Sequence, residues 1–306
     1  MASRIGLARR SSEEESPTRS ARALLLRFDA HELRAKFDRQ AFPIAHALAD
    51  HPLLQLTQLI ELATRLPIES VEYNSGDLPI NQDPATTPRT GFTIEQTLRD
   101  IERVGSWMAI KNVEQDPAYR QLLDACLDEF GSVGVAPGMT ARKGFIFVSS
   151  PGAVTPYHVD FEHNFLLQIR GRKQITVFDD QDRALFSEVE RERAVGGGPR
   201  NLVYREEFSS RSRTFDLEPG VGLHVPLTAP HWVKVGSETS VSFSITFQST
   251  GSDRIASAHR FNARLRSMGI APRRVGTSDA WDTAKYNAER TIRRSSQLLA
   301  RLTRRH

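Results

Sequence analysis

Cysteine is nearly absent from the chain, because Cys126 is the single one, and this excludes an internal disulfide and a cysteine-based zinc cluster. Its surroundings, AYRQLLDACLDEF, have the apolar spacing of a helix, which favours a packed thiol over a nucleophile. Apolar runs of the roughly 18–20 residues that cross a bilayer are also lacking, so no membrane span is expected. Residues 1–22 lack the apolar centre of a secretion signal. We therefore expect a disordered leader there and a cytoplasmic protein.

Acidic residues are scarce near the C-terminal end of the chain. Residues 252–306 hold thirteen Arg or Lys and only four Asp or Glu, although the whole chain has a formal net charge of +4. Such asymmetry can mark contact with nucleic acid or a membrane. A basic, solvated helix face is the commoner explanation, so nucleic acid is not expected as a partner.

The pattern along the chain predicts one strand-rich domain between helical segments. Residues 24–135 have a mixed α/β pattern, in which Asp116 is the expected N-cap and Pro117 the first residue of one helix. From about residue 140, short segments rich in β-branched and aromatic residues alternate with turns, as in a sandwich or barrel. ERERAVGGGPRN interrupts them and predicts a mobile loop at the barrel mouth. We expect a leader (1–22), a domain (23–250, core 140–250) and a helical extension (251–306).

Two histidines and an aspartate in this strand-rich part have the spacing of metal ligands. His158 and Asp160 are two residues apart, so in an extended segment their side chains leave the same face. His231 opens a later predicted strand and can supply the third ligand. Two His and one carboxylate form the facial triad of non-haem iron enzymes, which leaves positions open for O2 and a chelating co-substrate.

Lys173 starts the strand that follows the turn at Arg170–Arg172, and Asn164 lies in the strand before that turn, so both side chains can point into one barrel. A cation held deep in a barrel needs an anionic partner, which the distal carboxylate of 2-oxoglutarate would supply. Each residue also has a structural interpretation: a surface His–Asp pair, a core His231, a solvated Lys173, and turn formers at Asn164 and Thr155. His163 has the opposite strand parity and is not expected to ligate. For His224, a place in the barrel and a packed role are both open.

The stretch from Thr155 to Lys173 fits the pattern T-P-x-H-x-D-x-x-x-N-F-x-x-Q-I-x-G-x-K. In this pattern the chain resembles the JmjC-type hydroxylases of the cupin superfamily, and within them the asparaginyl hydroxylase that inhibits hypoxia-inducible factor. The resemblance covers roughly residues 140–250. It implies a mainly β fold, a double-stranded β-helix (cupin or jelly-roll barrel) with an N-terminal α/β region and C-terminal helices. It further implies Fe(II) at His158, Asp160 and His231, and 2-oxoglutarate beside Thr155, Lys173, Asn164, Phe147, Leu166 and Thr246.

The function that this resemblance implies is a 2-oxoglutarate-dependent dioxygenase. Such a hydroxylase inserts oxygen from O2 into a C–H bond of a protein side chain and decarboxylates 2-oxoglutarate to succinate. The alternatives are a hydroxylase of a small metabolite or lipid-linked acyl group, a lysine demethylase, and a non-catalytic cupin that binds a ligand or partner. The resemblance also implies a homodimer through the C-terminal helices, whose apolar stripe includes Trp281, Ala284, Ala288, Ile292, Leu299 and Leu302.

Overall fold

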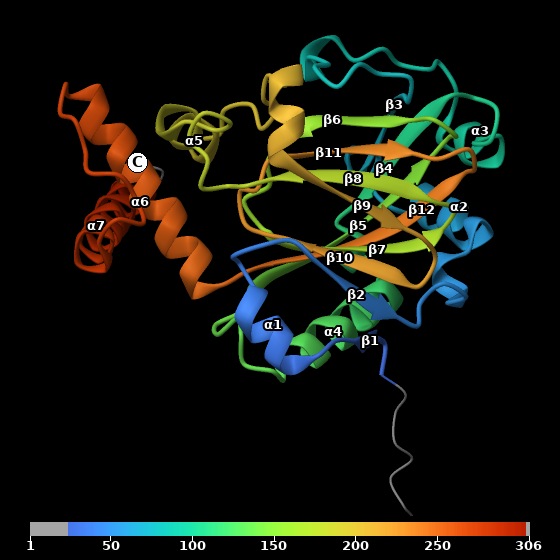
Figure 1. The fold of residues 1–306 in the computed structure, drawn as a ribbon, viewed down its shortest axis with the longest axis horizontal. Coiled ribbons are helices and arrows are strands. Elements are labelled where there is room, and N and C mark those ends of the chain that lie inside the picture. Colours follow the sequence, from blue (N-terminus) through green and yellow to red (C-terminus); the bar gives the residue numbers. More distant parts are fainter. Residues whose placement is uncertain (1–23, 304–306) are drawn as a thin grey trace, which may run out of the picture.

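The computed structural model of the chain describes residues 24–303, so the leader expected over residues 1–22 lies outside the described part. Within it, the strands form two antiparallel sheets, one above the other (Figure 1). The larger, eight-stranded sheet has the order β1 (Leu26–Arg27), β2 (Phe42–His46), β10 (Val221–Val225), β7 (His163–Arg170), β12 (Ser240–Gln248), β5 (Thr140–Ser149), β4 (Ser106–Lys111) and β3 (Val71–Ser75). The four-stranded sheet has the order β6 (Val154–His158), β11 (His231–Val235), β8 (Lys173–Phe178) and β9 (Ser212–Leu217).

Helices precede, interrupt and follow the strands. They are α1 (Ala30–Lys36), α2 (Leu56–Arg65), α3 (Ile94–Arg99), α4 (Pro117–Gly131), α5 (Glu188–Val195), α6 (Thr250–Ser267) and α7 (Asp279–Thr303). The predicted cap of α4 is confirmed, because the Asp116 carboxylate accepts hydrogen bonds from the N–H groups of Ala118 and Tyr119. None of the helices between residues 24 and 303 combines the length and the apolar character of a membrane span.

The two sheets bury an apolar layer between them. Leu166 of β7, Ile175 and Val177 of β8, and Val233 of β11 belong to this layer. Because strand side chains alternate between the two faces, Lys173 lies on the same inner face of β8 as Ile175 and Val177. The inner faces of the two sheets therefore carry most of the residues expected at the site.

The outer face of the larger sheet packs against helices α2 and α4. Phe165 of β7 and Phe247 of β12 belong to the large core formed there. His224 is buried on this side, with its ring centroid 4.9 Å from that of Phe37, so it has the packed role that the sequence left open. His163 also lies here, apart from the expected triad: its Nε2 is 2.8 Å from the Ser249 hydroxyl.

Helix α5 extends into the segment predicted as a mobile loop (190–201), so that prediction was wrong for residues 190–195. Ser187 caps the helix by accepting a hydrogen bond from the N–H of Glu190, whose side chain bonds back to the Ser187 N–H. Gly196 ends the helix, and Gly197 follows at φ 98°, in the left-handed region that favours glycine. The glycines therefore terminate a helix, and only the residues after them are irregular.

Helix α6 packs against α5 and α7, which stand beside one end of the sheets (Figure 1). Two of the arginines in this region form ion pairs with glutamates of neighbouring helices. Arg264 binds Glu289 of α7 at 2.7 Å, and Arg266 binds Glu192 of α5 at 2.7 Å. These two arginines therefore bind buried glutamates, and the solvated face expected from the sequence does not include them.

Candidate metal centre

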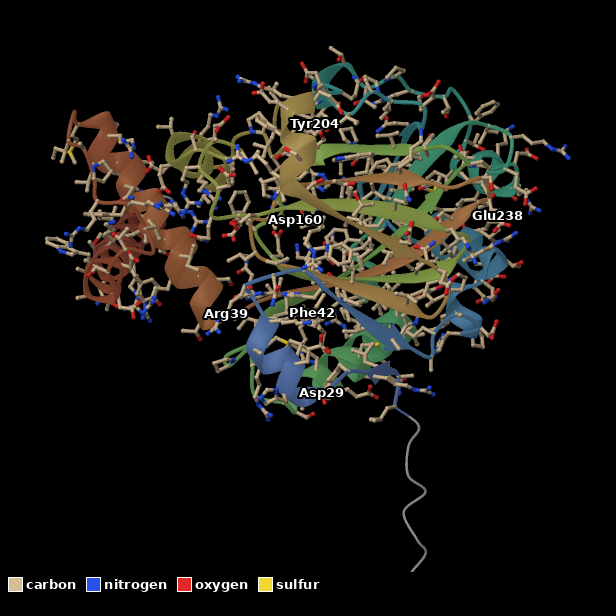
Figure 2. The ribbon with its side chains drawn as sticks, in the orientation of Figure 1. Asp29, Arg39, Phe42, Asp160, Tyr204 and Glu238 are labelled. Atoms are coloured by element: carbon tan, nitrogen blue, oxygen red, sulfur yellow. The ribbon has the colours of Figure 1, made fainter. Side chains whose placement is uncertain are left out.

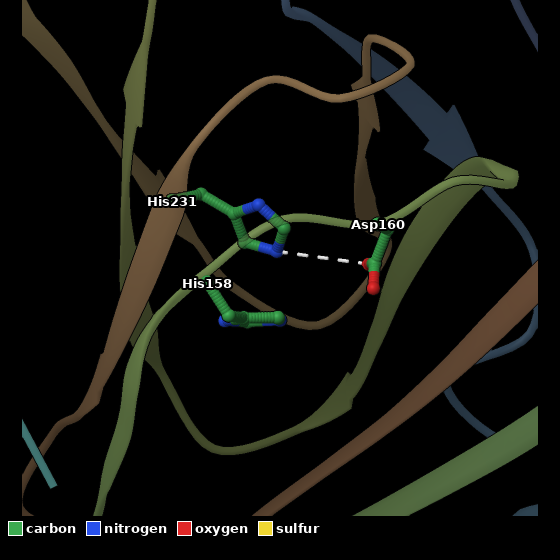
Figure 3. Close-up of side chains that lie close together, drawn as sticks. All are labelled: His158, Asp160 and His231. Carbon is green, nitrogen blue, oxygen red and sulfur yellow. Dashed lines mark ion pairs between the residues drawn. The ribbon is translucent and has the colours of Figure 1, made fainter. Parts of the chain in front are cut away.

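The two histidines of the expected triad face each other across neighbouring strands. His158 ends β6 and His231 begins β11; they are register partners, with ring centroids 4.2 Å apart. Asp160 follows β6 by two residues, and its Oδ2 lies 3.8 Å from Nε2 of His231 (Figure 3). One ligand atom from each of the three side chains lies within 4.8 Å of the others. The structure thus brings the predicted triad into one cluster.

Backbone carbonyl groups orient both imidazole rings. Nδ1 of His158 lies 2.7 Å from the carbonyl oxygen of Pro156, and Nδ1 of His231 lies 3.0 Å from that of Ala229. A carbonyl oxygen can only accept a hydrogen bond, so each Nδ1 carries a proton and donates it. Each Nε2 then keeps its lone pair. Metal-binding histidines commonly have this tautomer, fixed by the hydrogen bond of the other ring nitrogen.

The charges around Asp160 keep its carboxylate ionised. Burial alone would raise the pKa of this carboxyl. The opposing effects are larger and hold the pKa below its usual range: they come from His158, His231 and Arg200, and from a hydrogen bond donated by Asn164. Burial lowers the pKa of His231, and His158 adds to the effect. A carboxylate beside a neutral imidazole is the protonation state that metal binding requires.

Arg200 forms part of the wall beside the triad, although no pattern in the sequence marks it. Its guanidinium binds both carboxylate oxygens of Glu162, at 2.9 and 3.0 Å, and lies 3.6 Å from Oδ1 of Asp160. The neighbouring Asn201 forms an isolated β-bridge with His158. The segment that follows α5 thus meets the triad through tertiary structure alone, which explains why the sequence did not reveal its role.

A cleft of about 340 Å³ opens beside His158. Phe147 of β5 and Trp107 of β4 line it and stack with ring centroids 6.0 Å apart. Thr155 and Arg200 also border it. Of the residues expected around the co-substrate, Thr155 and Phe147 therefore share one cavity with His158.

Lys173 lies farther from the triad along the smaller sheet. Lys173 pairs with Val235 of β11, whereas His231 pairs with Val177 of β8. Four residues of β8, about 13 Å along the strand, therefore separate Lys173 from the position opposite His231. Figure 2 shows Asp160 and Glu238, which follows β11, at opposite ends of the sheets. Lys173 borders a depression at its own end, not the cleft that contains His158.

The Lys173 side chain is nevertheless buried, with 4% of the residue exposed. Within residues 24–303 its ammonium group has no ion-pair or hydrogen-bond partner. Burial lowers its pKa to about 7. An unpaired buried lysine is costly, so a ligand that supplies an anion would stabilise it.

The other three expected residues lie on the inner face of the larger sheet. Asn164 accepts a hydrogen bond from the Ser244 hydroxyl at 2.8 Å, and Leu166 is buried in the apolar layer. Thr246 is the register partner of Asn164 on β12, and its hydroxyl donates to the carbonyl of Lys143 at 3.2 Å. The Thr246 hydroxyl already has a partner in the chain, so its contact with a co-substrate remains a prediction.

A second group of side chains, Glu188, Glu192 and His259, also has ligand atoms within 4.8 Å of one another. Each glutamate is already bound by an arginine, Glu188 by Arg183 at 2.5 Å and Glu192 by Arg266 at 2.7 Å. Burial and nearby cationic groups hold the pKa of His259 at about 3. This positive potential disfavours a bound cation, so the cluster fits an ion-pair network between α5 and α6.

No protein-family model matches the chain, and no curated protein matches it. Solved structures of YcfD from Escherichia coli are similar to it in structure. One covers 87% of this chain and 68% of its own, at 15% identity and a TM-score of 0.48. Another, described as a ribosomal oxygenase with cobalt and 2-oxoglutarate, covers 88% and 68%, at 13% identity and a TM-score of 0.48. A likeness this remote does not decide the function of the chain.

Proposed function

We propose that the chain is an iron(II)- and 2-oxoglutarate-dependent oxygenase with His158, Asp160 and His231 as the iron ligands. The observation that carries this proposal is the pair of histidines whose Nδ1 protons are bound by carbonyls, beside an ionised carboxylate. Two imidazoles and one carboxylate are the donor set of non-haem iron oxygenases, and they leave open positions for O2 and a chelating co-substrate. The donor chemistry of this site therefore fits iron(II).

The strand order supports the same proposal. From β5 to β12, strands β5, β7, β10 and β12 lie in the larger sheet, and β6, β8, β9 and β11 lie in the smaller one. We infer from this exchange that residues 140–250 form a double-stranded β-helix of the cupin type. In this division, residues 23–250 are the catalytic domain and residues 251–306 a helical extension.

Lys173 is the residue that we propose to hold the distal carboxylate of 2-oxoglutarate. Its buried ammonium lacks an anionic partner, and it lies on the inner face of β8. Thr155 and Phe147 border the cleft next to His158, while Asn164 and Leu166 lie on the facing inner surface of β7. When bound, iron(II) and 2-oxoglutarate would supply the oxidation of a C–H bond by O2, with succinate and CO2 as products.

The chain's own groups would fix geometry and protonation for this reaction. The Pro156 and Ala229 carbonyls hold the histidine tautomers, and Asn164 binds the Asp160 carboxylate. The apolar layer between the sheets would exclude water from the site, which would strengthen electrostatic interactions there.

A protein side chain is the substrate that we propose. The Asp160 side chain is 26% exposed, and the neighbouring cleft has an aromatic wall at Trp107 and Phe147. A site accessible in this way suits a large substrate that inserts one side chain, either for hydroxylation or for removal of an N-methyl group. A small metabolite or lipid-linked acyl group is the runner-up, since a cleft of this size also accommodates such a molecule.

The test is succinate formation from 2-oxoglutarate with iron(II) and O2, comparing the parent protein with Asp160→Ala. Glu238→Ala removes an exposed carboxylate at the other end of the sheets and serves as the control. We expect succinate from the parent and the control, and none from Asp160→Ala. Equal turnover by Asp160→Ala would refute the triad. Mass spectrometry of peptide and metabolite libraries after turnover, scored for a gain of one oxygen, separates the two substrate classes.

A further inference from the structure

Arg191 of α5 is a buried arginine that forms no ion pair among the described residues, although the Asp180 and Glu188 carboxylates lie near enough to interact with it electrostatically. Only 2% of it is exposed, and its guanidinium lies 4.3 Å from the centroid of the Phe186 ring. Nε donates to the Phe186 carbonyl at 3.2 Å, and a second nitrogen donates to the Asp180 carbonyl. The remaining nitrogen, Nη1, donates to the Thr228 hydroxyl at 2.7 Å. An arginine that is fully desolvated yet bound to neutral groups is costly, which points to a positional role.

Thr228 lies in the loop between β10 and β11, with its backbone at φ 61°. This left-handed conformation strains a β-branched residue, so surrounding contacts must hold it. The Arg191 guanidinium binds its side chain, and its backbone N–H donates to the carbonyl oxygen of Asp160 at 2.9 Å. One strained residue thus joins α5 to the backbone of a proposed iron ligand.

The same loop also orients the second ligand. Ala229 follows Thr228, and its carbonyl accepts the Nδ1 hydrogen of His231 at 3.0 Å. The next carbonyl, of Pro230, accepts a hydrogen bond from the N–H of Phe178 in β8. A shift of Thr228 would therefore move the backbone of Asp160 and turn the ring of His231 together.

We propose that Arg191 is a positioning residue that sets the geometry of Asp160 and His231 through Thr228, an inference that rests on the proposed function. Removing a residue that orients a metal ligand without touching the metal typically lowers metal affinity by about 10–100-fold. Because Glu192 of α5 is bound to Arg266 of α6, this connection also joins the C-terminal helices to the metal centre.

The test compares Arg191→Gln, Arg191→Lys and Thr228→Ala with Arg193→Gln, which alters an exposed residue of the same helix. Cobalt(II) is the probe, and its affinity and visible absorption spectrum are measured on folded protein. We expect Arg191→Gln to bind cobalt at least about tenfold more weakly, with an altered spectrum, and Arg193→Gln to match the parent. Arg191→Lys, which keeps the positive charge and a donating nitrogen, should restore part of the affinity. The double variant Arg191→Gln/Thr228→Ala should lose no more than either single variant.

Hydrogen exchange of residues 226–231 in metal-free protein gives a second readout that needs no iron chemistry. The backbone amide of residue 228 should exchange faster in Arg191→Gln and Thr228→Ala than in Arg193→Gln. Unchanged exchange together with cobalt affinity within twofold of the control would overturn the inference. If the parent binds cobalt at the triad but forms no succinate, the proposed function fails while the positioning role stands. If the parent binds no cobalt, the exchange rates alone decide.

Discussion

His158 and His231 are register partners on adjacent antiparallel strands, and each donates its Nδ1 hydrogen to the carbonyl of the residue two positions before it. This repeated local geometry presets two imidazoles with their Nε2 lone pairs free, before any ion is bound. Preset ligands reduce the entropy that metal binding would otherwise cost. The pairing is thus the structural basis for the proposed metal centre.

Metal binding should depend on all three ligands. His231→Ala removes one of the three donors and leaves only His158 and Asp160 at the site. We expect the affinity for iron(II) or cobalt(II), measured anaerobically by calorimetry, to fall by at least about a hundredfold, more than the loss of an outer group causes. His224→Ala, which alters a histidine packed on the other face of the larger sheet, should lower the melting temperature and leave the metal affinity of the folded protein unchanged. Equal metal affinity of the parent and His231→Ala would contradict the assignment.

Lys173 should control the affinity for 2-oxoglutarate. Removing one partner of a buried charge pair costs on the order of 3–5 kcal/mol, so Lys173→Ala should weaken 2-oxoglutarate binding by at least about a hundredfold while the metal still binds. Lys111 is the comparison, because it borders the cleft beside His158 and is already paired with Glu72. Lys111→Ala should have little effect in the same calorimetric titration. If only Lys111→Ala weakened 2-oxoglutarate binding, the co-substrate would lie in the cleft beside His158 and not against Lys173.

The buried Lys173 should also make stability depend on pH in the ligand-free protein. The pKa of Lys173 is about 7 in the folded protein, against an ordinary value of 10.5 that applies to the unfolded chain. Between these two pH values the unfolded chain therefore binds more protons than the folded protein. Stability should therefore rise with pH through this window, and Lys173 should destabilise the protein most below pH 7. Lys173→Met should raise the free energy of unfolding by at most about 5 kcal/mol at pH 6 and by little at pH 10. Denaturant titrations at both pH values check this against Lys234→Met, an exposed lysine on β11.

The C-terminal helices should pair two copies of the chain. The face of α7 toward α6 is polar, with Asp282, Lys285 and Glu289 buried, whereas Trp281 on another face is 55% exposed. We expect the parent to sediment as a dimer and Trp281→Glu as a monomer, because a charge in an apolar interface is costly. Thr283→Glu, at another exposed position of α7, should remain dimeric. A parent protein that sediments as a monomer contradicts the dimer.

The triad could be predicted from the sequence because its spacing has a local cause. The i, i+2 spacing places His158 and Asp160 on one side of the chain, and His231 stands at the start of the next predicted strand. Arg200 and Arg191 could not be found in this way, since they reach the site through the segment between β8 and β9, which follows no recurrent pattern. The loop prediction failed in the same segment. It rested on the three glycines and did not take into account the capping pair Ser187 and Glu190, which starts helix α5.

The most direct test of the proposed function is the crystal structure of an anaerobic complex with iron(II) and 2-oxoglutarate. We predict iron bound by Nε2 of both His158 and His231 and by the Asp160 carboxylate. We also predict the keto acid of 2-oxoglutarate on the metal and its distal carboxylate within hydrogen-bond distance of Nζ of Lys173. Iron held at the cluster of Glu188, Glu192 and His259, or a triad without metal at saturating iron, would contradict the assignment.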